Sequence, residues 1–286
     1  MALPPGPWAT IAEFLVARFP RVAAAEWAAR IAAGDVVDEH GVRVTMTRPH
    51  LPHLHVHYYR SVAAEPRVAA EEAIVYRDDR IVVADKPHFL PVTPSGSHLQ
   101  ETLLVRLKRR LGIDTLAPVH RIDRETAGLV LFTIDPASRG AYQALFAGRQ
   151  VEKEYRCVAP ALEALAFPLT RRSRLVDDAT HFMRMREVDG EPNAVTEIDR
   201  LAREGPLTLY RLRPLTGRRH QLRVHCAALG MPIANDLIYP NLRPVGSDDP
   251  ARPLQLLAAA LAFIDPLGGE PRRFESRIRL QWPPEG

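Results

Sequence analysis

One acidic side chain, Asp123, stands among basic neighbours directly before an apolar run. It lies in the stretch HRIDRETAGLVLF, residues 120–132, between Arg121 and Arg124. A carboxylate kept ionised by a nearby cation can act as a nucleophile or as a base. A structural ion pair or a turn would give the same local pattern. No second acid stands at a spacing typical of a glycosidase pair, so Asp123 is a solitary candidate for catalysis.

A lysine and a tyrosine alternate in VEKEYRC, where Lys153 and Tyr155 share one face of a predicted strand. An edge strand with an extended lysine and a half-buried tyrosine explains this pattern. The functional alternative gives Tyr155 a ring that packs on a nucleobase and a hydroxyl that takes part in proton transfer.

Arginines gather without acids in one part of the chain. Between Pro206 and Asn235 there are five arginines and two histidines, and no aspartate or glutamate. A solvated basic face is one explanation. In RRHQLRVH, residues 218–225, basic and apolar residues interleave as on a helix with one buried side. That pattern favours a binding role, because arginine forms forked hydrogen bonds to phosphate.

Three histidines, His53, His55 and His57, alternate along PHLPHLHVHYYR at a spacing that resembles metal ligands. No matching Asp, Glu or His motif completes a site, so a polar exposed strand is favoured over a metal-dependent hydrolase. The phosphate-loop, dinucleotide and serine-hydrolase motifs are absent from the sequence, which argues against those enzyme classes.

The elements that position these residues belong to a chain of 286 residues with a net charge of +4 and a hydrophobic fraction of 46%. This composition is typical of a globular protein, and the basic balance is compatible with a polyanion partner. No apolar run is long enough for a membrane span, and the start does not resemble a signal peptide. The two cysteines, Cys157 and Cys226, have no disulfide or metal spacing, so we expect a reducing, cytoplasmic location.

The order of the predicted helices and strands indicates two domains joined by a linker. Residues 1–60 read as helices over 8–19 and 22–33, followed by a hairpin in DVVDEHGVRVTM with its turn at 39–41. Residues 61–70 read as a linker. Residues 71–286 mix strand-like runs with helical patterns at 101–112, 136–147 and 219–229, without regular βαβ spacing. This mixture predicts an α+β domain with a mostly antiparallel or mixed sheet.

Several motifs together match a known family. HRIDRETAGLVLF resembles the catalytic motif of the RluA family of RNA pseudouridine synthases, and AIVYRDDRIVVADKP, residues 73–87, is similar to its opening strands and Lys-Pro pair. KEY at 153–155, LTGRRHQLRVHCAALGMPIANDLIY at 215–239 and LQLLAAALAFIDPLGGE at 254–270 resemble its later motifs. The resemblance covers residues 71–281 in the family's order. It departs from the family at Phe89, Thr93, Ala127 and Leu257, where the family usually has Gly, His, Ser and His.

The resemblance implies roles for particular side chains. Asp123 would be the nucleophile, Arg223 its ion-pair partner, and Tyr155 the ring on the target base that can assist removal of the carbon 5 proton. Arg121 would occupy the gap left by the flipped uridine, and Leu256 would line the floor under the base. The substrate-binding residues implied by the same motifs are His120, Arg124, Lys153, Arg218, His220 and Gln221.

The resemblance also implies a fold and an activity. The fold is an α+β pseudouridine-synthase-like catalytic domain with a central RNA-binding cleft, preceded by a small, degenerate RNA-binding-like module of two helices and a hairpin. The activity is an isomerase that converts uridine to pseudouridine in structured RNA, with ribosomal RNA ahead of transfer RNA and with no cofactor or metal. A monomer is the default expectation. A catalytically idle RNA-binding or ribosome-assembly protein on the same fold is the alternative.

Overall fold

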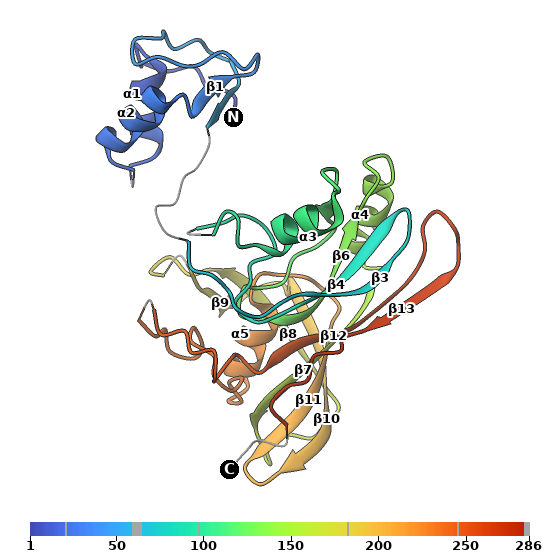
Figure 1. Cartoon of the computed structure of the whole chain (residues 1–286). Coiled ribbons are helices and arrows are strands. Elements are labelled where there is room, and N and C mark those ends of the chain that lie inside the picture. Colours follow the sequence, from blue (N-terminus) through green and yellow to red (C-terminus); the bar gives the residue numbers. More distant parts are fainter. Residues whose placement is uncertain (21, 59–64, 97, 182, 245, 283–286) are drawn as a thin grey trace. The chain divides into compact units, whose positions relative to one another are not determined.

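The computed structural model describes residues 1–20, 22–58, 65–96, 98–181, 183–244 and 246–282, and it divides into two compact units (Figure 1). Unit 1 is Met1–Ala64 and unit 2 is Glu65–Gly286. The boundary falls within 61–70, where the sequence predicts a linker. Residues 61–64 of that predicted linker lie outside the described residues.

Each unit has its own helices and strands. Unit 1 contains α1 (Ile11–Arg18), α2 (Ala24–Ala33), β1 (Val36–Asp38) and β2 (Val56–Tyr58). The helices of unit 2 are α3 (Leu103–Leu111), α4 (Arg139–Ala147) and α5 (Gln221–Ala228). Its strands are β3 (Ala73–Arg77), β4 (Ile81–Lys86), β5 (Ala117–Pro118), β6 (Ala127–Thr133), β7 (Glu152–Pro160), β8 (Leu169–Asp177), β9 (Met185–Val188), β10 (Ala194–Glu204), β11 (Leu207–Pro214), β12 (Leu256–Ile264) and β13 (Pro271–Glu275).

The two helices of unit 1 lie within the predicted ranges and enclose a small core. Phe14 and Leu15 of α1 pack with Trp27 and Ile31 of α2, because a spacing of three or four places these side chains on one helical face. The helix α1 begins three residues later than the predicted start at residue 8. The side chain of Thr10 caps it by accepting a hydrogen bond from the Glu13 amide at 3.1 Å.

The hairpin predicted around residues 39–41 is only partly correct. The turn exists, because the Asp38 carboxylate accepts hydrogen bonds from the amides of His40 (3.0 Å) and Val42 (2.8 Å). The returning strand, however, pairs through a single bridge between Val37 and Arg43. The regular antiparallel partner of β1 is β2, more distant in the sequence. The pairing is therefore decided by a contact that local patterning does not reveal.

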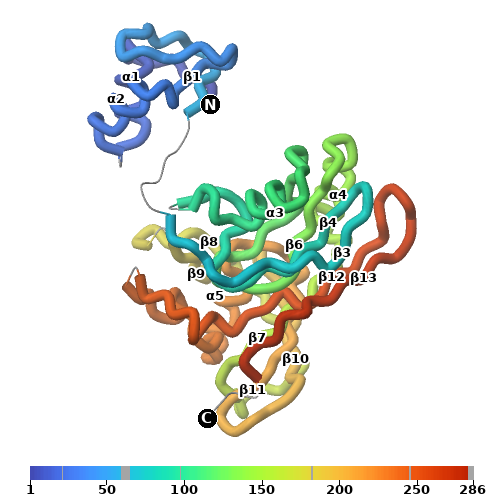
Figure 2. Tube along the Cα trace, in the orientation of Figure 1, coloured from blue at the N-terminus to red at the C-terminus, as the bar shows by residue number. Residues whose placement is uncertain are grey.

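Unit 2 is built on one eleven-stranded sheet whose continuous path runs β3-β4-β6-β12-β7-β11-β10-β8-β9 (Figure 2). The strands β13 and β5 pair with β12 and β6 beside this path. Every pairing is antiparallel except that of β12 with β6. The sheet is thus mixed and mostly antiparallel, as the sequence predicts.

The parallel contact between β6 and β12 requires a glycine. Gly128 has a φ of +112°, and a Cβ atom there would overlap the backbone of Ala258. Residues with a side chain avoid both this backbone region and such an approach. Gly128 therefore lets β12 enter beside β6, directly after the segment that carries Asp123.

The helix α5 is enclosed more fully than its sequence suggests. Interleaved basic and apolar residues predict one buried side, but every residue from Gln221 to Cys226 is buried. Leu222 and Cys226 pack in the same core as Cys157 of β7 and Tyr210 of β11. The polar side chains of α5 are therefore enclosed within the protein, where they need hydrogen-bond partners.

The segment 160–193 contains the antiparallel pair β8 and β9. The strand β8 also pairs with β10, so it extends the main sheet. Its sequence LTRRSRLVD alternates half-buried and exposed residues, and the charged residues conceal the strand pattern.

Among the described residues, no helix is long and apolar enough to cross a membrane.

Candidate active site

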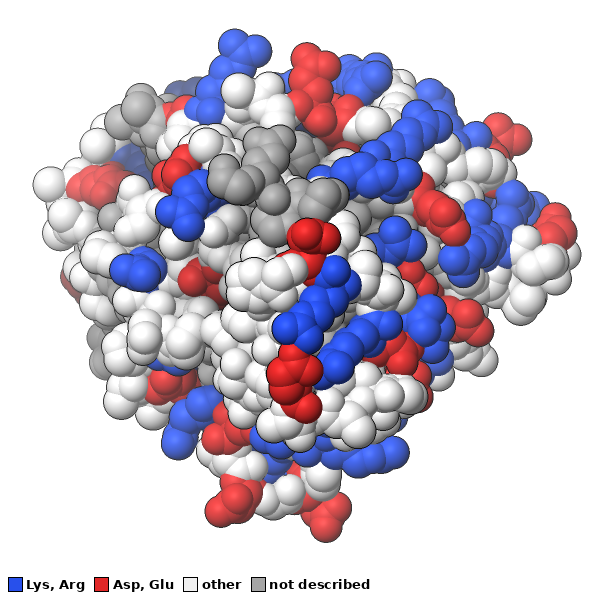
Figure 3. All heavy atoms as spheres, turned by 90° about the horizontal axis from the view of Figure 1, so that it is seen from below, with Lys and Arg blue, Asp and Glu red and all other residues white. Residues whose placement is uncertain are grey.

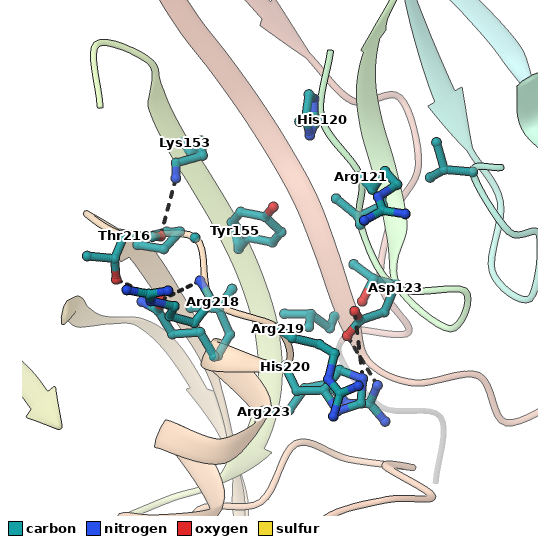
Figure 4. A pocket seen from close by; sticks show the side chains of 18 of the residues that line it. His120, Arg121, Asp123, Lys153, Tyr155, Thr216, Arg218, Arg219, His220 and Arg223 are labelled. Carbon is teal, nitrogen blue, oxygen red and sulfur yellow. Dashed lines mark hydrogen bonds and ion pairs between the residues drawn. The ribbon is translucent and has the colours of Figure 1, made fainter. Parts of the chain in front are cut away.

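A pocket of about 1190 Å³ opens where the loop before β6, the strand β7 and the start of α5 converge (Figure 4). Every site residue implied by the sequence motifs lines it. The residues come from segments that are about a hundred positions apart, such as Asp123 and Arg223. The pocket is concave and lined by both polar and apolar side chains, as expected for a site that encloses part of a ligand.

The centre of the pocket is an ion pair between Asp123 and Arg223. Nη1 of Arg223 lies 3.2 Å from Oδ2 of Asp123. The arginine side chain is only 1% exposed, whereas Asp123 is 24% exposed and open to the pocket. A buried guanidinium therefore balances the charge of a carboxylate that a substrate can still reach.

A third residue, Asp236, fixes the arginine, and the sequence analysis did not single it out. Its carboxylate accepts from Nε of Arg223 at 2.8 Å and from Nη2 at 2.7 Å. Although burial opposes the charged form, these hydrogen bonds raise the pKa of Arg223 further. The available signal was the tail PIANDLIY of the 215–239 motif, which contains Asp236.

A second acid, Glu125, also reaches this arginine, although the sequence gave no telling spacing for one. Oε2 of Glu125 lies 3.4 Å from the same Nη1 atom that contacts Asp123. Its Oε1 accepts from Nε of Arg124 at 3.0 Å. Asp123 is therefore not isolated among cations, and the local charge is nearly balanced.

Tyr155 lies on β7 beside the ion pair, as Figure 4 shows. Burial, and then the charge of Asp123, raise the pKa of its hydroxyl. Tyr155 is therefore a neutral phenol that offers a ring face and a hydrogen-bond donor, and its use as a base would require a phenolate. Leu256 is buried at the start of β12 and lines the same pocket.

The His120 side chain is held by contacts within the protein. Its Nε2 atom accepts from the Leu131 amide at 3.1 Å, and its ring stacks on Phe146 with centroids 4.5 Å apart. Burial, with the charge of Lys153, lowers the pKa of His120 to about 3. The imidazole is neutral at physiological pH and supports the strand β6.

Gln221 and Lys153 tie the segment 214–221 to the sheet. Gln221 accepts from the Thr216 hydroxyl at 2.7 Å and donates to the Val195 carbonyl at 2.9 Å. Lys153 donates to the Thr216 carbonyl at 3.3 Å. Burial, and then Arg149, lower the pKa of Lys153. Gln221 is 3% exposed, so it shapes the pocket wall from behind.

Three arginines surround the opening and differ in their partners. Arg124 donates to both carboxylate oxygens of Asp248, at 2.7 and 2.8 Å. Arg218 donates to the Asn193 carbonyl at 3.3 Å. Within the part of the chain that the structure describes, Arg121 has no hydrogen-bond or ion-pair partner, and it is exposed. Arg121 therefore has a guanidinium available for a substrate.

The Lys-Pro pair, Lys86 and Pro87, contacts the loop that carries Asp123 and Arg124. Lys86 is buried and donates to the carbonyls of Pro87 (2.9 Å) and Arg124 (3.0 Å). Burial lowers the pKa of Lys86 to about 7. Phe89, where the family usually has glycine, adopts a φ of +64°, and its ring lies 5.7 Å from the Arg124 guanidinium carbon.

Among the described residues, no group of three or more His, Cys, Asp or Glu side chains is placed to hold a metal ion. His53, His55 and His57 are exposed, and Nδ1 of His55 lies 3.1 Å from Glu39. On the face drawn in Figure 3, basic and acidic side chains are interspersed and form no single patch. The distinctive feature of unit 2 is thus the pocket.

Comparison with known proteins identifies one family. The model for RNA pseudouridylate synthase matches residues 80–228. The yeast mitochondrial tRNA pseudouridine(32) synthase (Saccharomyces cerevisiae) is 34% identical over 185 residues, which are 62% of this chain and 39% of that protein. The human pseudouridylate synthase RPUSD2 is 35% identical over 61% of this chain and 32% of its own length. This chain spans well under half of these two relatives.

A bacterial relative matches over most of its own length. The dual-specificity RNA pseudouridine synthase RluA of Haemophilus influenzae is 30% identical over 71% of this chain and 92% of its own length. Among solved structures, human RNA pseudouridylate synthase domain containing 1 matches with a TM-score of 0.60 and 25% identity, over 75% of this chain and 86% of that chain.

Proposed function

Because the chain belongs to the RNA pseudouridylate synthase family, we propose that it isomerises specific uridines to pseudouridine in structured RNA. The observation that carries the proposal is the Asp123–Arg223 pair, 3.2 Å apart, in a pocket lined by Tyr155 and Leu256. A partly exposed carboxylate oriented by a buried cation fits a nucleophile or a base.

The reaction rearranges bonds without net gain or loss of atoms. The C1′–N1 glycosidic bond of uridine breaks with the help of Asp123, the uracil rotates, and a C1′–C5 bond forms. The proton on carbon 5 then leaves to solvent, and N1 gains a proton. Tyr155 contributes a ring face for the base and a hydroxyl donor during these steps. An isomerisation of this kind needs no redox cofactor.

The target uridine must leave its stack to reach Asp123. Extrusion costs a few kcal/mol, and a side chain that fills the vacated space offsets part of that cost. The exposed Arg121, with no partner among the described residues, fits this role. Loops whose bases are already unstacked are the easier targets, so we propose stem-loop RNA as the partner.

We propose ribosomal RNA as the first substrate to test and transfer RNA as the second, with a monomer acting in the cytoplasm. The relatives include a transfer-RNA pseudouridine synthase and a dual-specificity RNA pseudouridine synthase, so both RNAs belong in the assay. The competing function is an RNA-binding or ribosome-assembly protein without catalysis. The assembled pair of Asp123 and Arg223 favours catalysis over this alternative.

Tritium release tests the proposal. RNA containing uridine labelled at carbon 5, prepared as ribosomal and as transfer RNA, is incubated with wild type, Asp123→Asn and Asp114→Asn. We expect release by wild type and by Asp114→Asn, whose carboxylate is exposed outside the pocket, and none by Asp123→Asn. RNA binding without release by folded wild type would support the non-catalytic alternative instead.

A further inference from the structure

His220 occupies a backbone conformation that residues with side chains rarely adopt. It is the residue before α5, with a φ of +53° and a ψ of 16° in the left-handed region. Such a conformation is strained for a residue with a side chain, and it persists where the surroundings enforce it. Here it turns the imidazole toward the pocket, as Figure 4 shows.

The ring faces the carboxylate oxygen that Arg223 leaves open. Nε2 of His220 lies 3.9 Å from Oδ1 of Asp123, whereas Nη1 of Arg223 lies 3.2 Å from Oδ2. Each oxygen of Asp123 therefore faces a different nitrogen. In an enzyme without substrate such contacts are often long, and they shorten in the complex.

A tyrosine from the 215–239 motif determines which nitrogen of His220 carries the proton. The Tyr239 hydroxyl lies 3.0 Å from Nδ1 of His220 and accepts from the Met185 amide at 2.7 Å. The hydroxyl has a single proton to donate, and Nδ1 at 3.0 Å is nearer than the Met185 carbonyl at 3.3 Å, so Nδ1 is assigned as the acceptor of that proton. The remaining proton of a neutral His220 is then on Nε2, facing Asp123.

The surroundings keep this imidazole neutral. Burial lowers the pKa of His220; the charge of Asp123 opposes this change, whereas Arg223 and Arg219 add to it. Its side chain is 12% exposed. A neutral imidazole with Nε2–H is a hydrogen-bond donor without a full charge.

We propose that His220 is a positioning residue for Asp123. Its neutral Nε2–H orients Oδ1 while Arg223 holds Oδ2, so that the carboxylate presents a fixed lone pair to the substrate. Tyr239 sets the tautomer that makes this possible. This inference rests on the proposed isomerase activity, and it assigns His220 a task other than contact with RNA.

Single-turnover tritium release distinguishes a positioning role of His220 from a contact with RNA. It is measured in four proteins: wild type, His220→Leu, His220→Gln and His225→Gln. Leucine removes the donor, and glutamine places an amide N–H near the position of Nε2. His225 is the matched control because it is a buried histidine on α5 that bonds Ser173 (3.0 Å) and Thr196 (2.9 Å), away from Asp123. RNA affinity and the Tm are measured for each protein.

We expect His220→Leu to lower the single-turnover rate by roughly 100-fold at saturating RNA, as for a misplaced reactive group, with unchanged Kd. His220→Gln should recover most of that rate. His225→Gln should lower the Tm and leave the rate unchanged. A wild-type rate in His220→Leu, a loss of RNA affinity alone, or equal loss in the leucine and glutamine variants would each overturn the proposal.

A spectroscopic measurement on wild type is independent of turnover. Nitrogen-15 NMR of labelled histidine should show Nε2 protonated and Nδ1 unprotonated in His220 at neutral pH, with the signal assigned by its loss in His220→Gln. The opposite tautomer, or a doubly protonated ring, would contradict the assignment. If wild type releases no tritium from any RNA, the proposed function itself is wrong, which is distinct from these outcomes.

Discussion

At the scale of single residues, the site depends on one buried guanidinium that three carboxylates share. Asp236 occupies two of the nitrogens of Arg223 in a forked arrangement, and Asp123 and Glu125 share the third. Forked pairs fix geometry as well as charge. The orientation of Arg223 relative to Asp123 is therefore set from behind, by a residue outside the pocket lining.

The carboxamide variant Asp236→Asn tests this arrangement. An amide oxygen accepts from only one of the two nitrogens, and its NH₂ group faces the guanidinium, so Arg223 should shift. We expect roughly 100-fold slower single-turnover tritium release, because small misplacements of reactive groups have effects of this size. Removing one partner of a buried pair should also lower the free energy of unfolding by about 3–5 kcal/mol.

Glu125→Gln is the matched control for Asp236→Asn, because its contact with Arg223 is longer, at 3.4 Å. It should affect the rate and the stability less. An Asp236→Asn protein that is folded and releases tritium at the wild-type rate would show that Asp236 has no part in orienting Arg223.

At the scale of elements, the β8–β9 hairpin decides which basic side chains are free to meet RNA. Arg171 and Arg172 are adjacent on β8 and are both candidates for contact with RNA. In the structure, Arg171 is tied to Glu187 of β9, with Nε 3.2 Å from Oε1. Arg172 projects from the other face of β8, is exposed, and has no hydrogen-bond or ion-pair partner among the described residues.

Arg172→Ala is therefore expected to weaken RNA binding while leaving the fold intact. Each phosphate contact that is lost reduces the slope of log K against log salt by about 1. A salt titration of RNA affinity measures this slope. Arg171→Ala is the comparison, because losing its ion pair should lower the Tm by loosening the hairpin. Identical slopes for wild type and Arg172→Ala would exclude a phosphate contact there.

At the scale of the whole molecule, all of the residues that line the pocket belong to unit 2. The first residue of that unit is anchored to it. The Glu65 carboxylate accepts from the amides of Leu99 (2.6 Å), Gln100 (2.9 Å) and Glu101 (2.7 Å). Although burial opposes it, these backbone hydrogen bonds lower the pKa of Glu65. Unit 2 therefore begins, in structural terms, at Glu65.

A chain of residues 65–286 should release tritium at the full-length rate when RNA is saturating, because the described residues that line the pocket belong to unit 2. A shorter chain, 71–286, lacks Glu65 and leaves three amides without their carboxylate acceptor, so its Tm should be lower. A 65–286 protein that is folded but inactive at saturating RNA would show that unit 1 takes part in catalysis. A comparison of the Kd for RNA between the full-length chain and the 65–286 chain would report any contribution of unit 1 to RNA binding.

The sequence by itself determined the fold class and the family. Periodicity placed α1, α2 and α3, and the motifs named Asp123, Tyr155 and Arg223 before any contact was visible. These features could be predicted because they depend on local spacing. The regular partner of β1, the β8–β9 hairpin and the burial of α5 could not, because they depend on pairing between distant segments.

Only the tertiary structure decided which partners each site residue has. The motifs implied that His120, Gln221 and Arg124 bind substrate, which stays a prediction, and the structure adds hydrogen bonds that join them to Leu131, Val195 and Asp248. It also joins Asp236 and Glu125 to Arg223, and it turns His220 toward Asp123. The physical reason is that burial obliges polar groups to find partners, and those partners come from parts of the chain that sequence spacing does not connect.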